Sequence, residues 1–269
     1  EMCIRDSSVT ALEFLIGKTT LLVGDSHGTV RSWFRIKPEG APTPDGAVLV
    51  NAHTFEGPRS PVTAISASRR RRMMAAGYEN GEVRLSYVTS DQLLAGRSAG
   101  FPVRRLAIAP KEDSLYVLGP GGELQDWRID APHPEITLRS LFRPVWYEGN
   151  VAPNHSWQSS SGSDDFEPKF GLVPLVFGTL KATFYSMLFG APIALLAAIY
   201  TSEFLHPRMK RKIKPLIEMM ASLPSVVLGF LAALVIAPFV ENVVPAVLLS
   251  FFLIPFLFLL SGHVTQLLP

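Results

Sequence analysis

Cysteine is almost absent from this sequence of 269 residues, since Cys3 stands alone. A single cysteine excludes an intrachain disulfide and a metal site built from several thiolates. The six histidines are scattered without the close spacing that metal ligation uses. No cluster of nucleophile, base and orienting residue can be recognised, and no glycine-rich phosphate loop. The sequence therefore predicts no enzyme activity, no catalytic residues, no metal and no cofactor.

Charge is missing from three long stretches near the end of the chain. No Asp, Glu, Lys or Arg lies between Lys181 and Glu203, between Glu218 and Glu241, or from Asn242 to Gly262. Each stretch approaches the ~20 residues that a helix needs to cross a bilayer. We therefore predict an all-α transmembrane domain at 171–269, with three helices at about 172–200, 217–239 and 243–260. The net charge of +2 is too small to indicate nucleic acid as a partner.

The first half of the chain repeats itself. Val9, Val62 and Val103 each begin a copy, and each is followed 19 residues later by a glycine: Gly28, Gly81 and Gly122. Short alternating strands with a period near 40 residues are typical of propeller blades. The glycines stand in turns where a positive φ is useful, and 37–46 is an inserted loop. We predict an all-β, propeller-like domain at 8–140 with about three WD-repeat-like blades, fewer than the four to eight that close a ring.

Three further segments need an interpretation. Arg69 to Arg72 lie between Ser68 and a predicted strand that begins at Met73, and we interpret this run as a solvated turn rather than a nucleic-acid site. Residues 141–170 are aromatic and serine-rich, without strand or helix periodicity, which predicts a connector. Its Trp and Tyr residues either lie at a membrane interface or cap the last blade. Residues 1–7 resemble a translated sequencing adapter, and the hydrophobic end at Pro269 suggests that the gene continues on both sides.

A basic segment sets the orientation of the spans. Five cationic residues lie close together between the first two spans: Arg208, Lys210, Arg211, Lys212 and Lys214. Short cytoplasmic loops carry such an excess of Lys and Arg. We therefore predict a cytoplasmic loop here and place residues 1–170 outside. Lys181, near the outer end of the first span, either snorkels outward or faces a polar interior.

The spans contain a specific motif. Residues 172–180 read Leu-Val-Pro-Leu-Val-Phe-Gly-Thr-Leu, and 217–229 read Ile-Glu-Met-Met-Ala-Ser-Leu-Pro-Ser-Val-Val-Leu-Gly. Both resemble the permeases of phosphate-type ABC importers (PstC and PstA types), whose membrane domain is MetI-like. The second run is similar to the family's Glu-x-x-Ala-x-x-Pro-Ser-x-x-x-Gly. The resemblance covers about 166–269, and some members carry a large extra domain between their first two membrane helices.

The resemblance implies a function and partners. The chain would be a multi-pass permease subunit in a bacterial inner membrane, with its repeat domain in the periplasm, importing inorganic phosphate. Its partners would be a second, PstA-like permease, cytoplasmic ATPase subunits, a periplasmic phosphate-binding protein and the lipid bilayer. Glu218, Pro224, Ser225 and Gly229 are candidates for helix packing and gating. Glu218 either pairs with the basic loop or is an ordinary interfacial carboxylate.

A second function remains open. The chain could be a membrane-anchored propeller that serves as a sensor or assembly scaffold without transport. That alternative predicts featureless spans, whereas these contain Pro192, Pro224 and Pro255 with several glycines. Proline and small residues suit a packed, multi-helix bundle better than a plain anchor.

Overall fold

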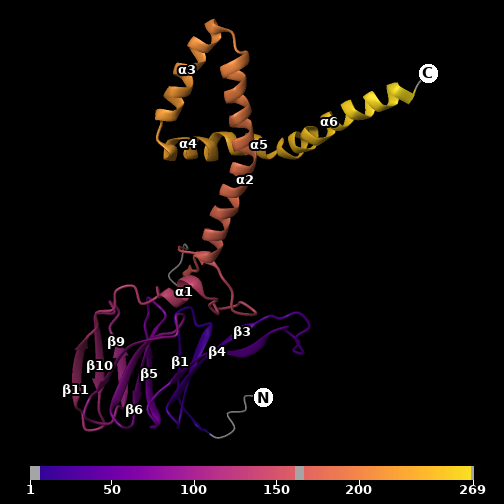
Figure 1. The fold of residues 1–269 in the computed structure, drawn as a ribbon. Helices are drawn as coiled ribbons and strands as arrows, with labels where there is room; N and C mark the ends of the chain where they lie inside the picture. Colours follow the sequence, from indigo (N-terminus) through magenta and orange to yellow (C-terminus); the bar gives the residue numbers. More distant parts are fainter. Residues whose placement is uncertain (1–6, 161–166, 268–269) are drawn as a thin grey trace. The chain divides into compact units, whose positions relative to one another are not determined.

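The computed structural model describes residues 7–160 and 167–267, which fall into two compact units, Glu1–Tyr185 and Ser186–Pro269. The adapter-like stretch, apart from Ser7, lies outside the described residues, and so does 161–165 of the serine-rich run. All the strands belong to the first unit, coloured indigo to magenta in Figure 1.

The strands of the first unit form three antiparallel meanders, one for each repeat. The first sheet contains β1 (Val9–Phe14), β2 (Thr20–Asp25), β3 (Thr29–Ile36) and β4 (Val48–Glu56). The second contains β5 (Val62–Ala67), β6 (Met73–Tyr78), β7 (Glu82–Tyr87) and β8 (Gln92–Ser98). The third has three strands, β9 (Arg105–Ile108), β10 (Ser114–Leu118) and β11 (Leu124–Arg128). The sheets of the described residues do not close a ring.

The repeated glycines have the conformation expected of them. Gly28, Gly81 and Gly122 have φ values of +91°, +86° and +90°, each in the turn before the third strand of its sheet. This left-handed backbone costs glycine little and other residues much more. The shared position thus confirms that the three copies fold alike.

A second glycine position brings neighbouring sheets together. Gly24 and Gly77 both lie 15 residues after the valine that begins their copy. A Cβ built on Gly24 would lie 2.7 Å from Val62 Cγ1, and one on Gly77 would collide with Val103 in the same way. The valine of each following copy therefore packs directly on the glycine of the copy before. The third copy has Leu118 at this position.

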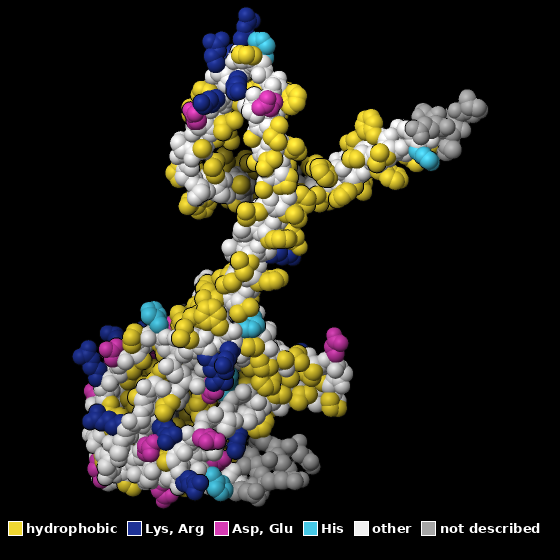
Figure 2. Space-filling view, in the orientation of Figure 1, with side chains coloured by type: hydrophobic (Ala, Val, Ile, Leu, Met, Phe, Trp, Pro, Cys, Tyr) yellow, Lys and Arg dark blue, Asp and Glu magenta, His cyan; other side chains and the backbone are white. Residues whose placement is uncertain are grey.

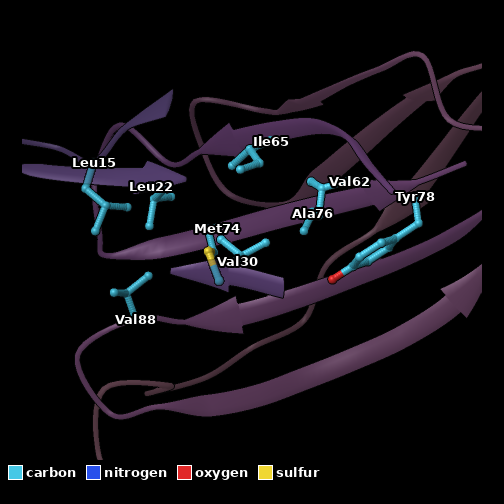
Figure 3. Packing of buried hydrophobic residues seen from close by; sticks show 9 residues of the cluster. All are labelled: Leu15, Leu22, Val30, Val62, Ile65, Met74, Ala76, Tyr78 and Val88. Carbon is cyan, nitrogen blue, oxygen red and sulfur yellow. The ribbon is translucent and has the colours of Figure 1, made fainter. Parts of the chain in front are cut away.

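The hydrophobic core lies between the sheets. One cluster joins the first sheet to the second, and Figure 3 shows its nine buried side chains: Leu15, Leu22, Val30, Val62, Ile65, Met74, Ala76, Tyr78 and Val88. A second cluster joins the second sheet to the third around Met73, Tyr87 and Val117. Strands alternate their side chains between two faces, so the middle sheet contributes to both clusters.

The connector is more ordered than its composition predicts. It begins with α1 (Leu138–Phe142), which Thr137 caps by accepting a hydrogen bond from the Ser140 N–H at 2.9 Å. Two short strands follow, β12 (Trp157–Gln158) and β13 (Lys169–Phe170), and they pair antiparallel. The absence of a regular sequence period therefore did not mean an absence of helices and strands. These elements are only two to five residues long, which is too short to produce a period.

The helical part contains two helices long and apolar enough to span a membrane. The first span, Val173–Phe204, comprises α2 (Val173–Ile199) and the π-helical turn η1 (Tyr200–Phe204). The second, Val244–Val264, lies within α6 (Val244–Leu267). Both agree with the first and third predicted spans.

The second predicted span is not one straight helix. It is divided between α3 (Pro207–Ser222) and a chain of short helices, α4 (Ser225–Leu231), η2 (Ala232–Ile236) and α5 (Ala237–Glu241). The two parts meet at 97°. The reason is Pro224, which disfavours helical backbone in the residue before it, and Leu223 is accordingly extended at φ −70° and ψ 139°. Within the described residues the chain thus has two unbroken candidate spans, and a third only if this bent pair counts as one span.

Candidate functional site

The basic segment lies on a helix rather than in a loop. His206 caps α3 by accepting a hydrogen bond from the Arg208 N–H at 3.3 Å, and Pro207 occupies the first helical position. Proline suits that position because its N–H would be unpaired there in any case. All five cationic residues predicted for a loop therefore stand on a helix, α3, and the cytoplasmic side predicted for them stays a prediction. Figure 2 shows their dark blue side chains gathered around the start of this helix.

The motif residues of the broken span stand on both sides of the bend. Glu218 lies on α3, Pro224 caps α4, and Ser225 and Gly229 lie on α4. A Cβ built on Gly229 would have no heavy atom within 4 Å. The close packing predicted for this glycine is thus not made within the described residues. Its part in helix packing and gating stays a prediction.

A hollow of about 460 Å³ lies beside α3 in the helical unit. Its lining includes Lys210, Lys214 and Glu218 from α3, with Ala194 and Ala197 from α2. Glu218 makes no ion pair within 4.0 Å among the described residues, although it shares this hollow with two lysines. Of the two alternatives for Glu218, direct pairing with the basic segment is not made within the described residues.

Lys181 lies against an aromatic ring of its own helix. Its ammonium is 5.9 Å from the ring centroid of Tyr185, one turn further along α2. A cation over an aromatic face is attracted by the ring quadrupole. Nearby, the Thr179 hydroxyl donates to the Leu175 carbonyl at 2.8 Å. These polar groups of α2 are thus satisfied within the helix.

A buried ionic cluster, which the sequence did not reveal, fastens the connector to the repeat sheets. Arg72, whose side chain is only 3% exposed, forms an ion pair with Glu148 and lies 3.8 Å from Glu167. Glu167 also accepts hydrogen bonds from the Thr89 hydroxyl and from the Glu148 N–H. Burial raises the pKa of the Glu167 carboxyl, although Arg72 opposes the effect. The solvated-turn interpretation therefore holds for Arg69 and Arg70, which are exposed, but was wrong for Arg72.

Arg71 is the second member of the arginine run with a structural partner. Its guanidinium lies 2.5 Å from the Glu112 carboxylate, in the turn between β9 and β10. Glu112 is buried and also accepts from the Ser68 hydroxyl. Arg71 thus pairs with a carboxylate of the third sheet, and Arg72 pairs with one of the connector.

The connector aromatics pack on the first sheet rather than on the last. Trp146 meets Phe34 of β3 edge to face, with ring centroids 5.8 Å apart. Its carbonyl oxygen accepts from Nε2 of His53 on β4 at 3.2 Å. Tyr147 is fully buried, whereas Trp157 is partly exposed and packs on Phe170. Trp146 therefore does not cap the last blade, whereas Tyr147 contacts Lys169 and Phe170, which both belong to the connector.

The repeat unit has a hollow of its own. It occupies about 430 Å³ between the second and third sheets, and Leu85, Leu94 and Trp127 supply apolar walls. Arg97 also lines it and lies 5.1 Å from the Trp127 ring centroid. In residues 7–160 and 167–267, no group of three or more His, Cys, Asp or Glu side chains could hold a metal ion.

Comparison with curated proteins finds relatives of one kind. The probable ABC transporter permease protein YqgH of Bacillus subtilis is 36% identical over 78 residues, which are 29% of this chain and 25% of the relative. The phosphate transport system permease protein PstC of Mesorhizobium japonicum is 28% identical over 113 residues, 42% of this chain and 34% of the relative. A probable PstA permease of Methanocaldococcus jannaschii is 35% identical over 69 residues, a quarter of each chain.

These relatives are ABC transporter permeases, mainly of phosphate transport systems, and permeases are not enzymes. The chain spans about a quarter to a third of the length of the curated relatives it matches. No protein-family model matches it.

Among solved structures, the similar ones are WD40 propellers. The β-propeller domain of Cps50 (Swd1) from Myceliophteria thermophila gives a TM-score of 0.40 at 18% identity over 48% of this chain and 38% of that one. The crystal structure of the mitotic checkpoint complex gives 0.39 at 16% identity, over 49% and 38%. Scores this low carry no argument about the fold, for which the strand pairing of the three sheets is the better guide. The chain thus joins a strand-rich region to apolar helices, and its curated relatives are ABC permeases.

Proposed function

We propose that the chain is part of the permease subunit of an ABC importer for inorganic phosphate, with an extracytoplasmic repeat domain. The observation that carries the proposal is the broken span: the run from Glu218 to Gly229 that resembles the family motif is the segment that bends by 97° at Leu223. Broken helices are tolerated in membranes where they line a cavity or pack in protein, as in transporters. The permease relatives support the same role.

The partners follow from this role. A PstA-like second permease would pair with the helical unit in a bacterial inner membrane. Cytoplasmic ATPase subunits would drive the change of access, and a periplasmic phosphate-binding protein would deliver the anion. The permease itself hydrolyses nothing, because alternating access requires only that the helices move around a central path.

Phosphate uptake by cells whose only phosphate importer contains this chain tests the proposal. We expect Gly229→Leu to abolish uptake while the protein still inserts, because a leucine would overfill a contact between moving helices. Gly190→Leu, on the long helix α2 and outside both motif runs, is the control for added bulk. If Gly229→Leu is present in the membrane at normal abundance and takes up phosphate normally, the segment around Gly229 is not part of the moving transport core. No phosphate uptake by the unmodified protein would reject the function.

The orientation has its own test. In a Cys3→Ser background, we expect a membrane-impermeant thiol reagent to label Ser98→Cys, which is exposed on β8. It should leave Ser202→Cys, which is close to the basic helix α3, unlabelled until the membrane is opened. Short cytoplasmic segments rich in Lys and Arg are the physical basis. Labelling of Ser202→Cys in intact cells would reverse the assignment.

The second candidate, a membrane-anchored sensor or scaffold, has one observation in its favour. The hollow between the second and third sheets offers apolar walls beside Arg97, which are the features of a small ligand site. This candidate predicts that the repeat unit binds a ligand while cells show no phosphate uptake. The two functions are therefore separated by the uptake measurement itself.

A further inference from the structure

The hollow beside α3 has two chemically different ends. One wall is made by Ala194, Ala197 and Ala198 of α2, whose small side chains leave the helix surface low and apolar. The other is made by Lys210 and Lys214, four residues apart on α3. Residues with this spacing lie on one face of a helix, one turn above the other. The hollow thus combines an apolar groove with a pair of ammonium groups.

The ammonium groups have donors to spare. Lys210 Nζ donates one hydrogen bond to the Ser202 carbonyl at 3.3 Å, and a lysine ammonium has three donors. The hydroxyls of Thr201 and Ser202 also border the hollow but donate to the carbonyls of Ala197 and Ile199. The lysines are therefore the groups in the lining that can bind an anion.

The charge of the lining selects the anion. Lys210 and Lys214 contribute two positive charges and Glu218 one negative charge, which leaves one positive charge. A phosphodiester has a single negative charge and would neutralise it. Inorganic phosphate or a phosphomonoester carries a charge of about −1.5 to −2 at neutral pH. Either would bring more negative charge than the lining can neutralise and would leave that excess negative charge beside the Glu218 carboxylate.

We propose that this hollow binds an anionic phospholipid of the bilayer leaflet that faces α3, with its phosphodiester on Lys210 and Lys214 and an acyl chain along Ala194, Ala197 and Ala198. The site goes beyond the proposed transport function and does not depend on it. Basic pockets between membrane helices favour such headgroups because the ammonium pair and the apolar groove match the two ends of one lipid. No part of the described chain covers the hollow, since none of its lining residues is buried.

Lipid binding to the full chain in detergent tests the proposal, with phosphatidylglycerol as the probe and native mass spectrometry as the readout. Each lysine in contact with the anionic headgroup contributes about fivefold to the affinity, so Lys210→Ala with Lys214→Ala should weaken binding about 25-fold. Arg211→Ala with Lys212→Ala removes the same charge from the same helix but outside the hollow, and should retain binding. Ala197→Phe fills the apolar groove without changing charge and should also weaken binding.

Four results would overturn the proposal. Equal losses in the two double variants would mean that any positive charge on α3 suffices. Phosphatidylcholine has the same phosphodiester but also a cationic choline, so its equal retention would show that the net negative charge of the headgroup is irrelevant. Unchanged binding by Ala197→Phe would place the lipid elsewhere. Displacement of the lipid by an equal concentration of inorganic phosphate would make the site one for the free anion. Phosphate uptake enters none of these measurements, so a failure here is distinguishable from a failure of the proposed function.

Discussion

Arg72 and Glu148 form a buried ion pair between the second repeat sheet and the connector that leads into α2. Glu148 also accepts hydrogen bonds from the hydroxyls of Thr19 and Thr20, at the start of β2. One carboxylate thus contacts the first and second sheets at once. Further along, Leu172 N–H donates to the Leu141 carbonyl at 2.8 Å immediately before α2. The repeat sheets are therefore tied to the start of this helix through ordered contacts.

Removing Arg72 should destabilise the repeat unit strongly. Breaking a buried pair by deleting one partner costs about 3–5 kcal/mol, because the remaining carboxylate is left without compensation. We expect Arg72→Ala to lower the urea midpoint of the full chain in detergent, followed by tryptophan fluorescence. Arg70→Ala is the matched control, since Arg70 is exposed in the same turn. Similar midpoints for the two variants would show that the cluster is not structural.

Packing between the first and second sheets depends on the missing side chain at Gly24. A Cβ there would lie 2.7 Å from Val62 Cγ1 and 2.8 Å from Val62 Cβ, so a bond rotation of Val62 cannot relieve both contacts. Gly24→Ala should therefore cost about 1–3 kcal/mol in unfolding free energy, the usual range for overpacking. Gly96→Ala on β8 meets no atom within 4 Å and should be nearly neutral. A neutral Gly24→Ala would contradict this close approach.

Acid should loosen the connector from the first sheet through His53. Burial lowers the pKa of this histidine, while its hydrogen bond to the Trp146 carbonyl and the charge of Asp91 oppose the shift, and Arg139 adds to it. A histidine with a lowered folded pKa binds fewer protons when folded than when unfolded. Its contribution is therefore complete above the unfolded pKa of about 6.5 and is lost as the pH falls below it.

The measurement is the urea midpoint of the full chain between neutral pH and pH of about 5. His53→Gln keeps an N–H that can donate to the Trp146 carbonyl and cannot be protonated in this range. We expect the unmodified protein to lose stability on acidification and the variant to lose less. Parallel pH profiles would exclude His53 as the titrating group.

The repeat pattern could be predicted because it is local. Turns such as that at Gly28 depend on residues a few positions apart, and the valine and glycine offsets recur in every copy. The ionic cluster could not be predicted in this way. Nothing within the arginine run distinguishes Arg72 from Arg70, since its burial depends on Glu148, 76 residues further along the chain.

Two prolines of the helical unit, Pro207 and Pro224, determine local structure that charge and hydropathy alone do not predict. Pro207 after His206 is a helix start, yet the cluster of positive charge suggested a loop. Pro224 was recognised as a helix-bending residue, but the uncharged stretch around it was long enough for one span, and length alone favoured a continuous helix. The predicted packing of Gly229 stays untested, because a Cβ built there meets no heavy atom within 4 Å in the described residues.

Pro224 should be the cause of the bend between α3 and α4. In Pro224→Ala the clash that keeps Leu223 extended is removed, and α3 can continue into α4. Spin labels at Leu216 and Phe230, both exposed, then report the change by pulsed electron resonance on the full chain. Fourteen residues of straight helix measure about 21 Å along the axis, whereas a bend of 97° brings the ends closer. We expect a longer distance in Pro224→Ala and no change in Pro215→Ala, which alters a proline inside α3. An unchanged distance in Pro224→Ala would mean that packing, and not the proline, holds the bend.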